Sequence, residues 1–193
     1  VMAGIMLGME AAKDLILGGI GAFSVGYLPL HLCSLCMFLC LFCAWHPTSR
    51  TGGALVWCLC LSGGLSALLF PDWTHFPIYH FQSLHSFLYH AMLVQFSLLC
   101  MCSGDIRPGL RDTWRVMGFL LAAAAVVYLL NTWLHTNYMF LMHPLPGTPL
   151  AFCASLPGGY LFWFGVLALV LVAFLLALAQ LCQFYIRRKR KTI

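Results

Sequence analysis

Histidine and cysteine are the side chains in this sequence best suited to chemistry, and several of them lie close together along the chain. The stretch 28–33 reads LPLHLC and places His31 two residues before Cys33, while His85 and His90 follow within one later apolar stretch. A thiol beside a histidine can become a thiolate nucleophile, with the imidazole as general base. Cys33 paired with His85 or His90 is therefore a candidate for attack on an ester carbonyl, although Cys33 can equally be a packing residue.

Three ionisable residues form a second candidate group near the start of the chain. Glu10, Lys13 and Asp14 are spaced so that they share one face of a helix. Ionisable groups at membrane depth normally face the interior of a helix bundle and pair with one another. We expect Glu10 and Lys13 to do so, either as a neutralised structural pair or as the polar wall of a site or proton path.

The other cysteines favour packing over metal binding. Cys33, Cys36, Cys40 and Cys43 follow a helical stripe, but the first and last are about 15 Å apart along an α-helix, which is too far for one ion. Cysteine behaves as a small hydrophobe and suits close helix packing in membranes. We expect no disulfide and no four-cysteine metal site among the ten cysteines.

The elements that must position these residues are membrane-spanning helices. Hydrophobic residues make up 62% of the 193 residues and charged residues only 8%, so a water-exposed surface cannot be built. Roughly 20 apolar residues span a bilayer as a helix. The sequence predicts an all-α, polytopic transmembrane bundle of about six spans, forming a single integral membrane domain over 1–193. The expected spans are 1–17, 29–45, 54–70, 80–102, 116–136 and 160–186.

The basic residues predict the orientation of this bundle. Nine of the ten lie in the link after the second span, the link after the fourth span and the tail after the last span. These places fall on one side of a six-span bundle, and basic residues in short loops mark the cytoplasmic side. We expect both termini to be cytoplasmic, with the tail as a topology anchor that can also attract anionic lipid.

The opposite face then collects the polar chemistry. Seven of the eight histidines, all but His46, fall in the outer half of the bundle or just beyond it, including His75 and His80 beside the fourth span. Interfacial histidines can simply cap helices or meet lipid headgroups, whereas those within spans are costly unless paired. Val1 already lies in an apolar run with no signal peptide before it, which leaves open that a further segment precedes it.

Three motifs together resemble one family. The stretch LPLHLC at 28–33, the fourth-span pattern of Phe81-Gln82 followed by Leu88-Tyr89-His90, and Thr136-Asn137-Tyr138-Met139 occur in the order found in the YwaF-like bacterial integral membrane proteins. Glu10 fits the acidic residue of the preceding span. This family is similar to transmembrane protein 164 of animals.

The resemblance implies an acyltransferase that moves acyl chains between phospholipids in a bacterial cytoplasmic membrane. Cys33 would be the nucleophile and His90, which matches the family histidine, the general base. The animal cysteine stands directly before the motif histidine, where this chain has Leu30, so that Cys33 lies one helical turn further on. His31 and Asn137 would orient the base or donate to the oxyanion.

The expected function is therefore an intramembrane lipid acyltransferase or acyl hydrolase that needs no cofactor, with Glu10 and His85 on the substrate side. One alternative is a non-catalytic membrane binding protein or small-solute transporter with a cavity lined by histidine and glutamate. Another is a histidine-ligated metal or haem protein. Membrane lipids are the expected partners and nucleic acid is not, while the sequence leaves the oligomeric state open.

The depths of Cys33 and His90 bear on this hypothesis. If the fourth span starts at His80, His90 lies about 15 Å below its end, whereas Cys33 lies about 6 Å below Pro29. Helix tilt of about 20° or a later helix start would reduce that mismatch. We expect Cys33 and His90 to approach each other in a pocket open to the outer leaflet.

Overall fold

The computed structural model describes residues 1–73 and 76–190, and within these ranges the chain is helical with no β-strand. His75 lies outside the described residues, as does Lys191. The α-helices are α1 (Met2–Gly19), α2 (Leu32–Trp45), α3 (Arg50–Leu55), α4 (Leu61–Leu69), α5 (Phe81–Ser103), α6 (Thr113–Leu134), α7 (Pro149–Ser155) and α8 (Tyr160–Arg190). The fold class expected from composition is confirmed.

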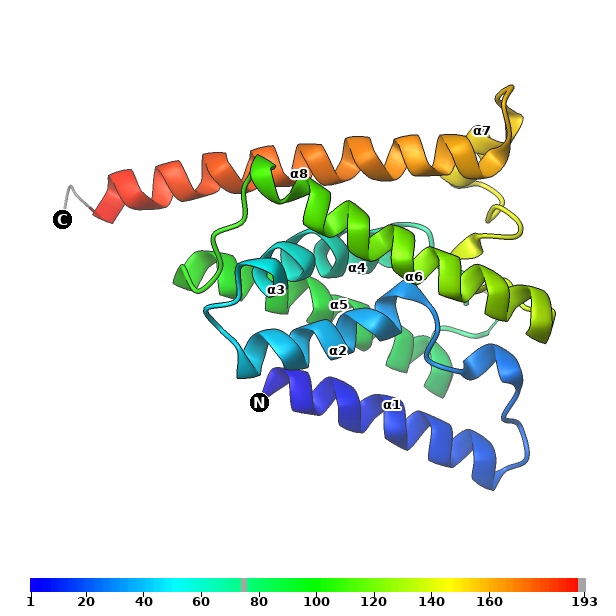
Figure 1. Cartoon of the computed structure of the whole chain (residues 1–193). Helices are drawn as coiled ribbons and strands as arrows, with labels where there is room; N and C mark the ends of the chain where they lie inside the picture. The colour runs from blue at the N-terminus through cyan, green and yellow to red at the C-terminus, as the bar shows by residue number, and fades with distance from the viewer. Residues whose placement is uncertain (74–75, 191–193) are drawn as a thin grey trace.

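Within the described residues, five mainly helical stretches are long and apolar enough to cross a membrane. They are Val25–Trp45, Arg50–Leu69, Phe81–Ser103, Leu110–Leu134 and Tyr160–Ile186. The first expected span is present as α1, an 18-residue helix, but its three charged residues distinguish it from the other five. α1 packs on α2 and α5 and runs the length of the bundle beside α2 (Figure 1).

The second of these stretches, Arg50–Leu69, occupies the centre of the bundle. Of its apolar window 61% is buried, against 17% to 33% for the other four stretches. It consists of α3, a π-helical turn over Val56–Cys60 (η2), and α4. Trp57 of this turn donates from Nε1 to the carbonyl of Leu175 on α8 at 2.7 Å, and Ser97 of α5 donates to the carbonyl of Val56 at 3.1 Å. Neighbouring helices thus satisfy the polar groups of the turn.

Gly64 allows α4 and α5 to approach closely. A Cβ atom at this position would lie 2.9 Å from the carbonyl oxygen of His90 and 2.8 Å from Cγ2 of Val94. The neighbouring Gly63 faces the first turn of α2, where a Cβ atom would lie 3.9 Å from Cδ2 of Leu32. The glycine pair therefore brings the start of α2 and the middle of α5 to the same level of the bundle.

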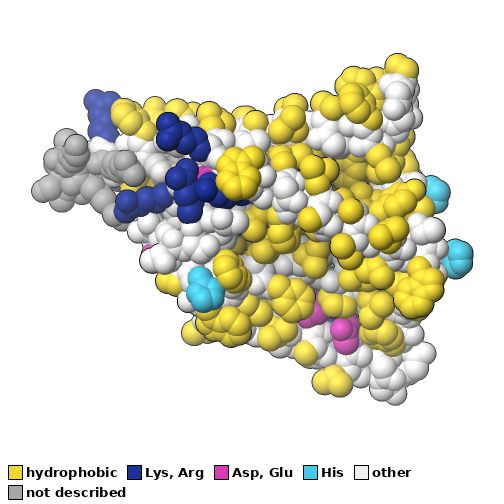
Figure 2. Space-filling model, viewed as in Figure 1, with side chains coloured by type: hydrophobic (Ala, Val, Ile, Leu, Met, Phe, Trp, Pro, Cys, Tyr) yellow, Lys and Arg dark blue, Asp and Glu magenta, His cyan; other side chains and the backbone are white. Residues whose placement is uncertain are grey.

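The two ends of the bundle differ in composition. The N-terminus and the C-terminal end of α8 lie at one end in Figure 1. The visible Lys and Arg side chains gather there in Figure 2, with the visible histidines mainly at the other end. At the basic end Asp112 is fully buried, and it accepts hydrogen bonds from Arg50 Nε at 2.8 Å, from Arg115, and from the backbone of Gly109 at 3.0 Å. This carboxylate ties α3 to the start of α6.

The segment between α6 and α8 contains four prolines and still forms a short helix, α7. α7 begins with Pro149 in its first turn, and the Thr148 hydroxyl accepts a hydrogen bond from the backbone of Leu150 as its cap. Proline is tolerated at that position because the first helical N–H groups have no partner within the helix.

Candidate functional site

His31 stands at the start of α2, in contact with the loop that follows α6. Its Nδ1 accepts a hydrogen bond from the backbone N–H of Met139 at 3.4 Å. The ring packs edge-on against Tyr138, with centroids 5.2 Å apart, and lies 5.8 Å from the ring of Phe140. Because Nδ1 accepts, the neutral imidazole carries its proton on Nε2, and this N–H donor has no hydrogen-bond partner among the described residues.

Two asparagines hold this loop in place. Asn131, buried near the end of α6, accepts from the backbone N–H of Tyr138 at 2.8 Å and donates to its carbonyl at 3.0 Å. Asn137 accepts from the backbone N–H groups of Met142 and His143 and donates to the His143 carbonyl at 2.9 Å. The structure therefore places the Asn137 amide on its own loop.

The same loop contains a strained backbone. Met139 and Phe140 have φ angles of 57° and 54°, in the left-handed region that residues with a Cβ atom seldom occupy. Such strain persists only where the surroundings determine the conformation, and the bonds from Asn131, Asn137 and His31 do so here. Strained positions of this kind cluster at binding and catalytic sites.

His90 is buried on α5 with its tautomer determined by the backbone. The residue is only 6% exposed, and its Nδ1 is 2.7 Å from the carbonyl oxygen of Ser86. A carbonyl oxygen can only accept, so Nδ1 carries the proton and Nε2 retains its lone pair. The indole of Trp73 stacks on the imidazole, with centroids 5.2 Å apart and planes within 7° of parallel.

Ser83, Ser86 and His90 follow one face of α5 at helical spacing. The hydroxyl of Ser83 is buried and has no hydrogen-bond partner among the described residues. A buried hydroxyl without a partner is costly, and in native structures it calls for an explanation such as a ligand. This face thus combines an available base with an available donor.

Cys33 lies in the first turn of α2, and its backbone is tied to α5. The hydroxyl of Tyr89 donates to the carbonyl of Cys33 at 3.2 Å, and the Tyr89 ring meets the His90 ring edge-on at 5.7 Å. Cys33 and residues 89–90 are therefore at closely similar depth, which reduces the mismatch inferred from helix rise alone. Among the described residues, no hydrogen bond joins the thiol to the imidazole.

Glu10 and Lys13 face the interior of the bundle, as predicted. Lys13 Nζ is 2.6 Å from Glu10 Oε1 and 3.3 Å from Asp14 Oδ1, and the Lys13 and Glu10 side chains are 12% and 9% exposed. His85 Nε2 lies 3.9 Å from Glu10 Oε2 and donates to the carbonyl of Met9 at 3.2 Å. The two expected substrate-side residues, Glu10 and His85, are thus neighbours between α1 and α5.

A polar cavity of about 360 Å³ opens at the histidine-rich end. His31, Asn137, Tyr138 and Phe140 line it, together with Asp72 from the loop before α5. Its volume is in the range of small-molecule sites. Trp73, the residue after Asp72, stacks on His90, but neither of these two residues is among the described residues that line the cavity.

The described histidines and cysteines offer no cluster for a metal ion. Within residues 1–73 and 76–190, no group of three or more histidine, cysteine or acidic side chains converges suitably. All ten cysteines are free thiols, and the sulfur atoms of Cys40 in the predicted stripe and Cys60 are 3.7 Å apart. Most of the stripe is buried in the central core, as a packing role requires.

Sequence reasoning missed several residues that build this site. Asn131, Ser83 and Trp73 were not singled out, although each is a polar or aromatic residue near a span end, and Tyr138 was named only as part of the motif at 136–139. Asn131 is an amide within an apolar helix, which is costly without partners and was the available signal. Trp73 reaches His90 from a loop, and no spacing rule relates two such positions.

Fold and site together define the class of this chain: it is a polytopic helical integral membrane protein with a polar cavity, lined in part by His31, at one end. A family model for the TMEM164 family matches residues 1–178, and the chain therefore belongs to that family. This membership confirms the relationship expected from the three motifs. No curated protein and no solved structure is detectably similar to the chain.

Proposed function

We propose that this protein transfers or hydrolyses acyl chains of membrane lipids, with Cys33 as nucleophile and His90 as general base. The observation that carries the proposal is the hydrogen bond from Tyr89 to the Cys33 carbonyl, because it holds the first turn of α2 level with His90. The hydrogen bond from His90 Nδ1 to the Ser86 carbonyl keeps the proton of the neutral imidazole on Nδ1, so that Nε2 can accept a proton.

The chemistry balances without a cofactor. His90 takes the Cys33 proton, the thiolate attacks the ester carbonyl carbon, and a C–S bond forms. The C–O bond then breaks, and the lysophospholipid leaves with the proton from His90. A second lysophospholipid hydroxyl, or water, then attacks the thioester carbonyl carbon and gives its proton to His90. The new C–O bond forms as the C–S bond breaks, and His90 returns the proton to the departing sulfur, which restores the Cys33 thiol.

Other site residues take supporting roles in this proposal. The first backbone N–H groups of α2, which lack helical partners, and the Ser83 hydroxyl are donors for the oxyanion. His31 offers its Nε2 proton to the cavity and the lipid headgroup. Asn137 is a positioning residue, since its amide holds the loop that walls the cavity.

Substitutions that keep the local hydrogen bonds test the catalytic pair. His90→Asn retains an N–H near the position of Nδ1 but removes Nε2, and acyl release from a labelled phospholipid in proteoliposomes should fall at least about a hundredfold. Cys33→Ser should reduce release to the background of empty vesicles, while Cys102→Ser, at an exposed position, should not. Release by Cys33→Ser at the rate of the unaltered protein would exclude Cys33 as the nucleophile.

A transport function is the second candidate, favoured by Asp14. Its Oδ1 atom is buried at an ion-pair distance of 3.3 Å from Lys13 Nζ, and no hydrogen bond among the described residues satisfies it. Such intramembrane carboxylates often form proton paths. Glu10→Gln should then abolish proton flux into vesicles while leaving acyl release intact. If Glu10→Gln instead lowers acyl release, and the unaltered protein shows no proton flux, Glu10 belongs to the substrate side of the lipid site.

We further propose that the basic end faces the cytoplasm, with the polar cavity in the opposite leaflet. The gathering of Lys and Arg at one end supports this orientation (Figure 2). A tag after the C-terminus should be labelled only in permeabilised cells. Labelling in intact cells would reverse the topology.

A further inference from the structure

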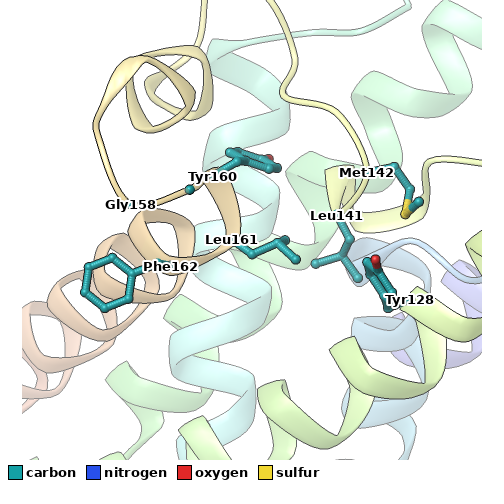
Figure 3. Close-up of a pocket in the computed structure, with 8 residues that line it drawn as sticks. Tyr128, Leu141, Met142, Gly158, Tyr160, Leu161 and Phe162 are labelled. Carbon is teal, nitrogen blue, oxygen red and sulfur yellow. The ribbon is translucent and has the colours of Figure 1, made fainter.

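A second cavity lies between α6 and α8, on the other side of the loop that walls the polar cavity. It has a volume of about 350 Å³ and is lined by Tyr128 of α6, Leu141 and Met142 of the loop, and Leu161 from the first turn of α8. Figure 3 shows Leu141 and Leu161 pointing toward each other across it. The described lining contains no charged side chain.

The surroundings of this groove identify its occupant. α6 and α8 diverge toward this end of the bundle (Figure 1), and they are the least buried of the candidate spans. Leu129 on α6 is 70% exposed and Val170 on α8 is 61% exposed, so the faces beside the groove are apolar and face lipid. In a bilayer the groove is continuous with that surface, and the molecules that surround it are lipids.

The start of α8 keeps the groove open. Gly158 and Gly159 have φ angles of 102° and 98°, a conformation that residues with a Cβ atom rarely adopt. A Cβ atom at Gly159 would meet nothing within 4 Å. The chain therefore turns into α8 without placing a side chain in the mouth of the groove.

The groove and the polar cavity share one wall. Phe140 lines the polar cavity, whereas the next residues, Leu141 and Met142, line the groove. The left-handed conformations of Met139 and Phe140 produce this reversal of direction, and Tyr160 of the groove donates from its hydroxyl to the Phe140 carbonyl at 2.6 Å. An apolar site and a polar site are thus held back to back across a single short segment.

We propose that this groove binds one acyl chain of a membrane phospholipid whose polar end lies in the cavity beside His31. The inference deepens the proposed function, on which it rests for the identity of that lipid as substrate. Binding itself needs no turnover. Tyr160 acts here as a positioning residue, because it couples the groove to the segment that packs on His31.

Photocrosslinking of the full chain tests this assignment. The protein is reconstituted in vesicles of phosphatidylcholine that carry a diazirine in the acyl chain, irradiated, and mapped by peptide mass spectrometry. Crosslinks should concentrate on Tyr128, Leu141, Met142 and Leu161. Leu161→Trp should fill the groove and lower labelling there about tenfold, which corresponds to about 1.4 kcal/mol of lost binding.

A matched substitution separates the groove from general contact with lipid. Leu169 is exposed on α8 about two turns beyond Leu161, and Leu169→Trp should leave groove labelling unchanged. Two results would overturn the proposal. One is labelling spread evenly along the exposed faces of α6 and α8. The other is unchanged groove labelling in Leu161→Trp protein that elutes as a single species. If Cys33→Ser keeps both the groove labelling and the turnover of the unaltered protein, lipid binding in the groove is supported, and Cys33 with His90 is excluded as the catalytic pair.

Discussion

The two ends of the bundle are both held by buried polar networks, but the networks are of different kinds. At the basic end, Asp112 is paired with Arg50 and Arg115, and the charges satisfy one another. At the histidine-rich end, amides and imidazoles bond to backbone groups, and free nitrogens and two cavities remain. A closed network stabilises a fold, whereas a network with unused groups is available to a ligand.

Removing the buried charge should have the largest effect on stability and little effect on the cavities. Asp112→Asn leaves two arginines without their carboxylate, and the free energy of unfolding should fall by about 3 kcal/mol. Denaturant unfolding in detergent micelles measures this change. Asp105→Asn, at an exposed position in the same loop, is the control and should cost less than about 0.5 kcal/mol.

The equivalent substitution at the histidine-rich end should affect both stability and ligand binding. Asn131→Ala leaves the backbone N–H and carbonyl of Tyr138 without their partner, which should cost about 2 kcal/mol. Acyl-chain crosslinking in the groove should also fall, because the wall loses its support. Full crosslinking in Asn131→Ala would show that other contacts hold the strained loop. Thr132→Ala, at an exposed position on the same helix, is the matched control.

The pH dependence of stability should distinguish the two ends at high pH. Burial raises the pKa of the Tyr138 hydroxyl, which donates to the carbonyl of Val25. The folded protein then keeps this proton to higher pH than the unfolded chain, so the free energy of unfolding falls as pH rises above about 10. Tyr138→Phe should remove that part of the decline and cost about 1 kcal/mol at neutral pH. An identical pH profile in both proteins would contradict this.

The smallest expected effect is stabilising. His135 ends α6 in a left-handed conformation, with φ of 53°, and its side chain is exposed. His135→Gly removes the Cβ penalty at a helix C-cap and should raise the free energy of unfolding by about 0.5 kcal/mol. The melting temperature in detergent measures it, and a decrease would mean that the imidazole contributes more than the strain costs.

The fold was predictable because long apolar stretches and one-sided basic residues depend only on local sequence. The inward direction of Glu10 and Lys13 followed from their spacing and from the cost of charge in lipid. The stacking of Trp73 on His90 was not predictable, since it joins a loop to a distant helix face. The positive φ angles at Met139 and Phe140 were not predictable either, because tertiary hydrogen bonds impose this conformation on two residue types that do not favour it.

The π-helical turn at Val56–Cys60 makes the central helix intolerant of changes in length. The turn accommodates one more residue than regular α-helix would, and so it rotates α4 relative to α3. α3 meets α6, whereas α4 faces α5 through Gly64. Deleting one residue here would turn the Gly63–Gly64 face by about 100°, away from both α2 and α5. Related sequences should therefore vary in the length of their loops but keep the number of residues in this stretch. In a relative with a deletion here, the start of α2 at residue 32 and the histidine at position 90 would no longer lie at the same level of the bundle.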